Sequence, residues 1–288
     1  MNKFQSVLQG LKLYIGRNKM ILGDSRVPAE KNKVNLHYWI ADPVRGKHNL
    51  GDYLSYVIVE YLKKENKIQD DCVRKTKHLY AVGSVLGNGF QNATVWGSGF
   101  MNDPQGSIQS RILQRKGLRK LDVRAVRGPL TRQALLKLGH NCPEIYGDPA
   151  ILMPLLYTPA KVSEKQNYVV VSHMADSARY ENSVPILTDD YAGFVDRLCG
   201  AERVISSSLH GIILAESYGI PAVLFLPEAT RGNLTLFKYQ DYYYGTHRTE
   251  FPVARTIEEA LAVTPCPVPD MTLQRAALLQ AFPADLWK

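Results

Sequence analysis

Three serine hydroxyls and one imidazole stand together between two apolar runs of the chain, in the stretch RVISSSLHGIILAESYGIPAVLFL. They belong to Ser206, Ser207, Ser208 and His210. Hydroxyl and imidazole groups donate hydrogen bonds to anions, and imidazole also titrates near neutral pH. The stretch therefore predicts anion binding or proton transfer. The alternative is that one serine caps a helix and His210 is only a polar residue at the helix start.

The elements around these side chains indicate how they would be positioned. Residues 204–205 end a predicted buried strand, and residues 212–215 are apolar all round, as in a fully buried helix. Gly219 ends that helix, Pro221 prevents its continuation, and residues 222–226 form a second strand. Such a unit builds a parallel sheet, whose ligands bind beyond the carboxyl ends of the strands. The helix N-terminus there favours an anion.

Four further segments place polar residues at the predicted carboxyl end of a strand. They are Asn49–Asp52, Trp96–Gly99, Arg127–Pro129, and Ser172–His173 with Asp176 nearby. Each also has a structural explanation, because Asp52 suits a helix N-cap and an arginine such as Arg127 pairs with surface carboxylates. Asp148, before Pro149, has the same ambiguity as Asp52. Together the segments predict one site assembled from several strand ends.

Strands and helices alternate twice along the chain. Strands are expected within 35–41, 78–84, 93–99, 121–128 and 168–173, and helices within 47–62, 129–139, 190–200, 256–264 and 271–282. The polar segment 157–167 is a candidate linker. We therefore expect an α/β protein with two Rossmann-like domains facing a cleft, residues 1–157 and 158–288. The C-terminal helices are expected to pack back on the first domain.

The composition excludes several classes of protein. The 288 residues carry a net charge of +8, but the basic residues are scattered, which favours small anions or an anionic membrane over nucleic acid. Four separated cysteines indicate a reducing compartment, and the chain shows neither a signal peptide nor a membrane span. We expect a cytoplasmic protein. An amphipathic start at Phe4, Val7, Leu8 and Leu11 suits docking on the domain or peripheral membrane association.

Taken together, five stretches resemble the polysaccharide pyruvyltransferase family. They are HNLGDYLS, VWGSGF, VRGPLTRQALLKLG, YGDPAILMP and ISSSLHGIILAESYGIPAV, and KYQDYYYGT after them is similar to the subgroup that makes pyruvate ketals on exopolysaccharides. The resemblance implies a GT-B-like fold and pyruvyl transfer from phosphoenolpyruvate to a sugar, forming a cyclic ketal and releasing phosphate. It implies functional positions at Asp52, Arg127 and His210. The acceptor would be a saccharide or a lipid-linked oligosaccharide of a bacterial exopolysaccharide or capsule.

These residues suggest a division of roles. His210, Asp52 and His173 are the catalytic candidates, His210 as general acid and Asp52 as acceptor of the hydroxyl proton. The candidates for binding phosphoenolpyruvate are Arg127, Ser206, Ser207, Ser208, Gly211 and Lys238. The candidates for binding the acceptor are Asn49, Gly51, Ser98, Tyr242 and Tyr243. The four tyrosines Tyr239, Tyr242, Tyr243 and Tyr244 either stack on sugar rings or form a buried cluster. The chemistry requires no metal and no cofactor.

One departure from the family bears on the donor site. Many members have arginine immediately before Leu-His-Gly, where this chain has Ser208. Arg127, Arg132, Lys238 or Arg248 are the candidates to replace that cation, or Ser208 itself binds the phosphate. Two other functions stay open on the sequence: a GT-B-type glycosyltransferase that uses a nucleotide sugar, and a non-catalytic subunit of polysaccharide assembly.

Overall fold

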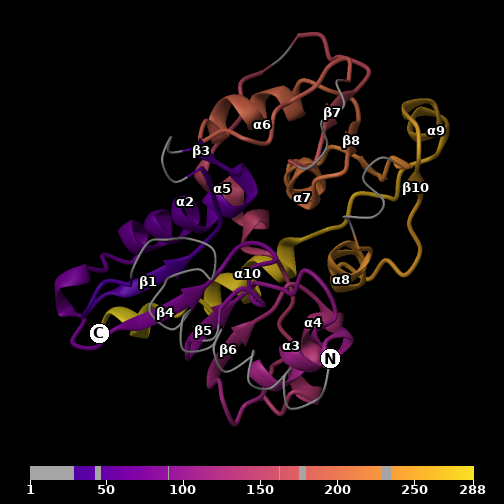
Figure 1. Ribbon diagram of the computed structural model, residues 1–288. Helices are drawn as coiled ribbons and strands as arrows, with labels where there is room; N and C mark the ends of the chain where they lie inside the picture. The colour runs from indigo at the N-terminus through magenta and orange to yellow at the C-terminus, as the bar shows by residue number, and fades with distance from the viewer. Residues whose placement is uncertain (1–28, 43–46, 90, 162, 175–179, 229–234) are drawn as a thin grey trace.

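Two parallel four-stranded sheets form the frame of the protein, as the computed structural model in Figure 1 shows. The structure describes residues 29–42, 47–89, 91–161, 163–174, 180–228 and 235–288. The first sheet has the order β1-β4-β5-β6 and the second the order β10-β9-β8-β7. The predicted α/β class is therefore confirmed. The predicted amphipathic start and Asp176 lie outside the described residues.

The strands are short. The first sheet contains β1 (Val34–His37), β4 (Lys77–Tyr80), β5 (Ala93–Trp96) and β6 (Leu121–Ala125). The second contains β7 (Val169–Val171), β8 (Val204–Ser206), β9 (Ala222–Phe225) and β10 (Val253–Ala254). An antiparallel pair, β2 (Ile40–Asp42) and β3 (Lys47–His48), follows β1, so the strand expected over 35–41 is divided in two. Every residue of β5, β7, β8 and β9 is buried, as expected for parallel strands covered on both faces.

The helices connect and cover these strands. They are α2 (Leu50–Glu65), α3 (Ile108–Leu113), α4 (Pro129–Lys137), α5 (Met153–Leu156), α6 (Tyr191–Cys199), α7 (Leu209–Ser217), α8 (Phe237–Gly245), α9 (Ile257–Ala262) and α10 (Thr272–Gln280). The 3-10 helices are η1 (Asp70–Cys72), η2 (Pro104–Gly106), η3 (Pro149–Leu152) and η5 (Ala284–Trp287). All nine residues of α7 are buried, which confirms the fully buried helix predicted from its apolar sequence.

The helix ends agree with the proline and glycine signals of the sequence and differ from one predicted N-cap. Pro129 opens α4, and Gly139 and Gly219 follow α4 and α7 with φ of +89° and +80°, a conformation that glycine adopts at little cost. The N-cap predicted at Asp52 is wrong. Asn49 caps α2, because its side chain accepts a hydrogen bond from the Gly51 amide at 3.1 Å. Asp52 lies in the first turn of the helix, and its carboxylate does not cap α2.

The two halves of the chain contact each other closely. Helix α7 packs on α2, η3 and α5 of the first half and on β8, β9 and α6 of the second. The Leu50 amide donates to the carbonyl of Ile186 at 2.9 Å across the same boundary. Further along, α10 returns to the first sheet, where the Trp96 indole donates to the Leu278 carbonyl at 2.9 Å (Figure 1). The boundary predicted at residue 157 lies between β6 and β7 and stays a prediction.

Candidate functional site

The turn from β8 into α7 presents free donors beyond the second sheet. The amides of Leu209, His210 and Gly211 are the first three of α7 and have no acceptor within the helix. Ser206 shapes the turn, since its hydroxyl donates to the carbonyl of Val171 at 2.9 Å and accepts from the Ser208 amide at 3.0 Å. Gly211 permits this packing, because a Cβ at that position would overlap the Ser206 hydroxyl. The result is a helix N-terminus suited to an anion.

The neighbouring serines take different positions. The Ser207 hydroxyl accepts a hydrogen bond from the amide of His173 at 2.8 Å, so it fixes the segment that follows β7. Ser208 is the N-cap residue of α7, and its hydroxyl makes no hydrogen bond to another described residue. Ser206 and Ser207 therefore hold the turn, and Ser208 has the hydroxyl that is free for a ligand.

The imidazole of His210 lies directly against the first turn of α2. A Cβ on Gly51 would overlap the imidazole ring, so only glycine allows the two helix starts to approach this closely. His210 is 8% exposed, and its buried Nε2 has no hydrogen-bond partner among the residues that the structure describes. Such an orphaned buried nitrogen is expected where a ligand completes the site.

Asp148 connects this imidazole to the loop after β4. Its carboxylate accepts from the amides of Ala150 and Gly83 at 3.0 and 3.1 Å, and Oδ2 lies 3.7 Å from His210 Nε2. Gly83 has φ of +93°, and a Cβ there would come within 2.9 Å of the Asp52 carboxylate. Asp148 thus does cap a short helix, η3, and in the same position its carboxylate can orient the imidazole.

Asp52 is the second carboxylate beside His210. Burial raises the pKa of Asp52 from 3.8 to about 6, the charges of His210 and Lys238 lower it, and the charge of Asp148 raises it. Its carboxylate makes no hydrogen bond to another described residue, and the residue is partly accessible. A carboxyl group with a pKa near 6 can accept or release a proton close to neutral pH.

Lys238 on α8 supplies a buried cation. It is 3% exposed, and its ammonium forms no ion pair or hydrogen bond with another described residue, although it lies 4.9 Å from the centre of the Tyr239 ring. Burial and the charge of the nearby Arg127 lower the pKa of Lys238 to about 8, and the charge of Asp52 opposes the shift. A buried, unpaired ammonium is costly unless a ligand anion pairs with it.

Arg127 lies nearby but has partners within the protein. Its Nε is 3.0 Å from the carboxylate of Asp241 on α8, and its two terminal nitrogens donate to the Ser84 hydroxyl at 2.5 Å and the Phe100 carbonyl at 2.7 Å. Both charged side chains are fully buried. Arg127 therefore does pair with a carboxylate, as one of the two sequence interpretations predicted, but this carboxylate is buried and not on the surface. Arg127 fixes α8, and hence Lys238, against the first sheet, and its direct contact with a substrate stays a prediction.

His173 lies beside the turn of α7, held through its amide by Ser207. Burial and the adjacent Lys238 lower the pKa of His173 to about 4. The imidazole is therefore neutral at neutral pH, and its ring offers one hydrogen-bond donor and one acceptor.

The predicted acceptor residues occupy two kinds of position. Asn49 and Gly51 form the start of α2, and Ser98 is fully buried, donating to the Gly83 carbonyl at 2.9 Å. Tyr242 and Tyr243 are 2% and 1% exposed. Tyr242 donates to Glu216 at 2.6 Å, and Tyr243 stacks on Phe251 with ring centres 4.1 Å apart. These two tyrosines are therefore buried, which agrees with the buried cluster that the sequence analysis gave as one alternative.

The other candidate cations are occupied. Arg248 forms a two-point ion pair with Glu216 at 2.6 and 2.7 Å, and Arg132 pairs with Glu144 at 3.0 Å. Sequence reasoning missed Gly83 and Ser84 as site residues, although a glycine and a serine after a predicted strand repeat the signal noted at Trp96–Gly99. It also missed Asp241, for which no local signal exists, because its partner Arg127 is 114 residues away in the chain.

A helix start suited to an anion, two carboxylates and an imidazole together can bind an anionic ligand and transfer protons. The chain belongs to the polysaccharide pyruvyl transferase family, whose model matches residues 49–228. It is also 26% identical over 238 residues to the uncharacterized protein L143 of Acanthamoeba polyphaga mimivirus, with 77% of this chain and 78% of that protein covered. The family implies a transferase of pyruvyl groups to polysaccharide.

The described part of the chain has neither a metal-binding cluster nor a membrane-spanning helix. No cluster of three or more His, Cys, Asp or Glu side chains there could hold a metal ion. None of the helices described is both long enough and apolar enough to span a bilayer.

Proposed function

We propose that the protein transfers the pyruvyl unit of phosphoenolpyruvate to two hydroxyls of one sugar in a bacterial exopolysaccharide or capsule repeat unit. The product is a cyclic pyruvate ketal, and phosphate is released. The acceptor is a saccharide, free or lipid-linked, and the two sheets act as the lobes of a GT-B-like arrangement. The observation that carries the proposal is the convergence of Asp52, Asp148, His210 and Lys238 at the N-terminus of α7.

The donor needs two anion-binding groups, one for its phosphate and one for its carboxylate. The free amides and the Ser208 hydroxyl at the start of α7 suit one anion, and the unpaired ammonium of Lys238 suits the other. Of the four cations that could replace the arginine missing at Ser208, only Lys238 is without an anionic protein partner among the described residues. We therefore assign that replacement to Lys238.

Ketal formation needs one proton donor and two proton acceptors. His210 gives a proton to the methylene carbon of the donor, which makes the adjacent carbon electrophilic, and Asp148 stabilises the protonated imidazole. A sugar hydroxyl bonds to that carbon and loses its proton to Asp52. The bond to phosphate then breaks, and a second hydroxyl closes the ring, with the neutral His173 as candidate acceptor of its proton.

The donor is tested by incubating the protein with phosphoenolpyruvate or labelled sugar nucleotides and measuring which donor is consumed. His210→Asn should lower phosphate release at least about 100-fold, because it removes the proton donor. His247→Asn is the matched control, since His247 is exposed with φ of +62° and asparagine tolerates that conformation. Consumption of a sugar nucleotide instead, or near-normal phosphate release by His210→Asn, would contradict the proposal.

A further inference from the structure

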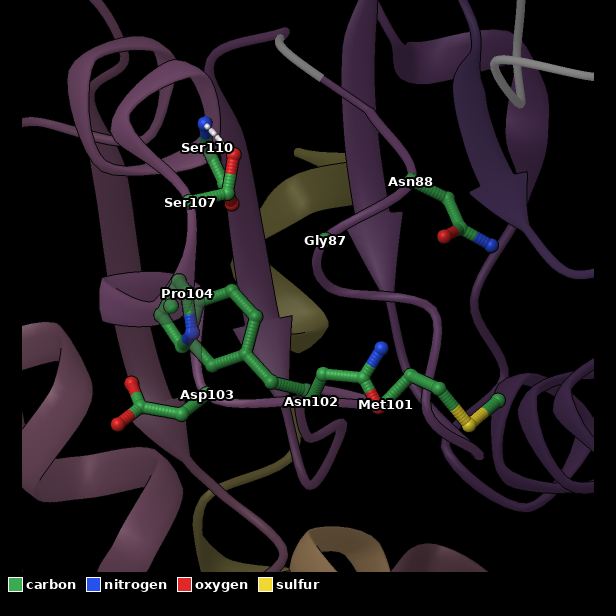
Figure 2. Close-up of a pocket in the computed structure, with 10 residues that line it drawn as sticks. Gly87, Asn88, Met101, Asn102, Asp103, Pro104, Ser107 and Ser110 are labelled. Carbon is green, nitrogen blue, oxygen red and sulfur yellow. Dashed lines mark hydrogen bonds between the residues drawn. The ribbon is translucent and has the colours of Figure 1, made fainter. Parts of the chain in front are cut away.

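A cavity of about 410 Å³ is formed by Gly87 and Asn88 from one loop and by residues 100–104, 106–107 and Ser110 from the next (Figure 2). Figure 2 shows Asn88 at the right of the view, Asn102 and Met101 below, and Pro104, Ser107 and Ser110 at the left. This volume lies in the range of small-ligand sites.

The cavity and the candidate site are built from the same two loops. The loop after β4 places Gly83 beside His210 and continues to Gly87, and the loop after β5 runs from Gly99 into the cavity wall. The loops are tied together, since the Gly99 amide donates to the Gly83 carbonyl at 3.0 Å and the Leu86 amide to the Gly99 carbonyl at 3.2 Å. Gly87 is three residues from Ser84, a span of at most about 11 Å.

Arg127 marks the junction between the two. Its guanidinium binds Ser84 in the first loop and the carbonyl of Phe100 in the second, and Phe100 is part of the cavity wall. A ligand that extends from the candidate site along these loops would therefore enter the cavity.

The side chains that line the cavity select the chemistry of that ligand. Asn88 offers a donor and an acceptor, Asn102 offers its NH2 group while its Oδ1 accepts from the Thr235 hydroxyl at 2.6 Å, Ser110 adds a hydroxyl, and Asp103 is the only charged residue in the described wall. Because none of the described lining residues is a lysine or an arginine, they offer no ion pair to a phosphate, a carboxylate or a nucleotide diphosphate. Met101, 42% exposed, and Pro104 offer apolar surface for C–H groups. Hydroxyl groups on an apolar ring frame are the chemistry of a neutral sugar.

We propose that this cavity binds a sugar unit of the acceptor adjacent to the one that receives the pyruvyl group. The inference rests on the proposed function, and it assigns substrate recognition to Gly87, Asn88 and Asn102, a set of residues separate from Asp52 and His210. Acceptor affinity and donor affinity should then respond to different substitutions.

A cavity-filling variant tests this on the full chain. An added Cβ on Gly106, which lines the cavity, or on Gly117, which does not, meets no atom within 4 Å, so a new side chain starts from open space at both positions. The probes are methyl glycosides and disaccharides of glucose, galactose and mannose, with binding read by saturation-transfer NMR. Gly106→Trp should abolish the signal of the best sugar, and Gly117→Trp should keep it.

A second pair of variants keeps the inference testable if Gly106→Trp does not fold. Asn88→Ala should weaken sugar binding about tenfold by removing hydrogen bonds, whereas Asn141→Ala, at an exposed position outside the cavity, should not. Phosphoenolpyruvate affinity, measured by calorimetry, should be equal in all four variants. No sugar signal in the wild type, or a signal unchanged in Gly106→Trp and Asn88→Ala, would overturn the inference. If the wild-type protein binds the sugar but not phosphoenolpyruvate, the proposed donor is wrong, and the assignment of the cavity to a sugar stands.

Discussion

At the scale of the residue, the two carboxylates beside His210 differ in their hydrogen bonds. Asp148 accepts from two backbone amides and is fixed, whereas Asp52 makes no hydrogen bond to another described residue. Fixed hydrogen bonds suit a group that orients an imidazole, and an unbonded carboxylate suits a group that exchanges a proton with substrate. Two residues of the same type therefore suit two different roles, and the sequence around Asp52 and Asp148 does not show which role belongs to which.

Asp52→Asn should separate activity from stability. Because the pKa of Asp52 is raised from 3.8 to about 6, the folded protein binds more protons than the unfolded chain between these values. Stability therefore falls as pH rises through this window, and the loss persists above pH 6. Asp52→Asn should be more stable than wild type at pH 8 by about 1–3 kcal/mol and show little gain at pH 3.

The same variant should lose activity. If Asp52 accepts the hydroxyl proton, wild-type kcat/KM falls below about pH 6, and Asp52→Asn is at least about 100-fold slower at pH 8. Urea unfolding at pH 3 and 8 and a pH–rate profile measure the two effects. Asp189→Asn, at an exposed position, is the control. A stability difference independent of pH, or activity close to wild type, would contradict the assignment of Asp52.

At the scale of the element, the sequence predicted most strands and helices because their signals are local. Pro129 and Gly139 delimit α4, and the apolar run after His210 predicts the buried α7. It missed Asn49 as the cap of α2, since Asp52 offers the same cap chemistry three residues later. It predicted that the starts of α2 and α7 share one site, but it could not predict that Gly51 lies directly against the His210 ring, because that contact depends on how two separate sheets pack. The candidate site follows from this contact.

Gly51→Ala tests the contact between the two helix starts. Alanine favours a helix by about 1 kcal/mol over glycine, so α2 itself would be stabilised. However, the new Cβ would overlap the imidazole of His210 and displace it from Asp148. We expect kcat to fall by about 100-fold, since small displacements of catalytic groups have effects of this size. Gly117→Ala, whose Cβ meets nothing within 4 Å, should leave kcat unchanged. Steady-state kinetics with circular dichroism would show this, and a Gly51→Ala rate within twofold of wild type would refute it.

At the scale of the whole molecule, the C-terminal segment joins parts that are far apart in the sequence. Helix α10 and the residues after it reach the first sheet at Trp96 and at Lys77, whose ammonium donates to the Leu286 carbonyl at 2.6 Å (Figure 1). Arg275 on α10 also donates to the carbonyls of Ile151 and Ser217 at 2.9 and 2.6 Å. The sequence predicts α10 from its periodicity, but the carbonyls that Arg275 binds carry no side-chain signal, so its role was not predictable.

Arg275 links the two elements that carry Asp148 and His210. Ile151 lies in η3, which Asp148 caps, and Ser217 is the last residue of α7, whose first turn contains His210. Arg275→Ala should lower the free energy of unfolding by about 1–3 kcal/mol, because it removes two hydrogen bonds from a charged donor. It should also lower kcat by up to about 100-fold, because the spacing between Asp148 and His210 is no longer fixed. The affinity for phosphoenolpyruvate, which depends on Lys238 and the start of α7, should change much less.

Urea unfolding, kinetics and calorimetry on this variant measure the three effects, with the exposed Gln280→Ala on the same helix as control. Loss of stability with unchanged kcat would show that α10 only holds the two halves together and does not set the geometry of the site.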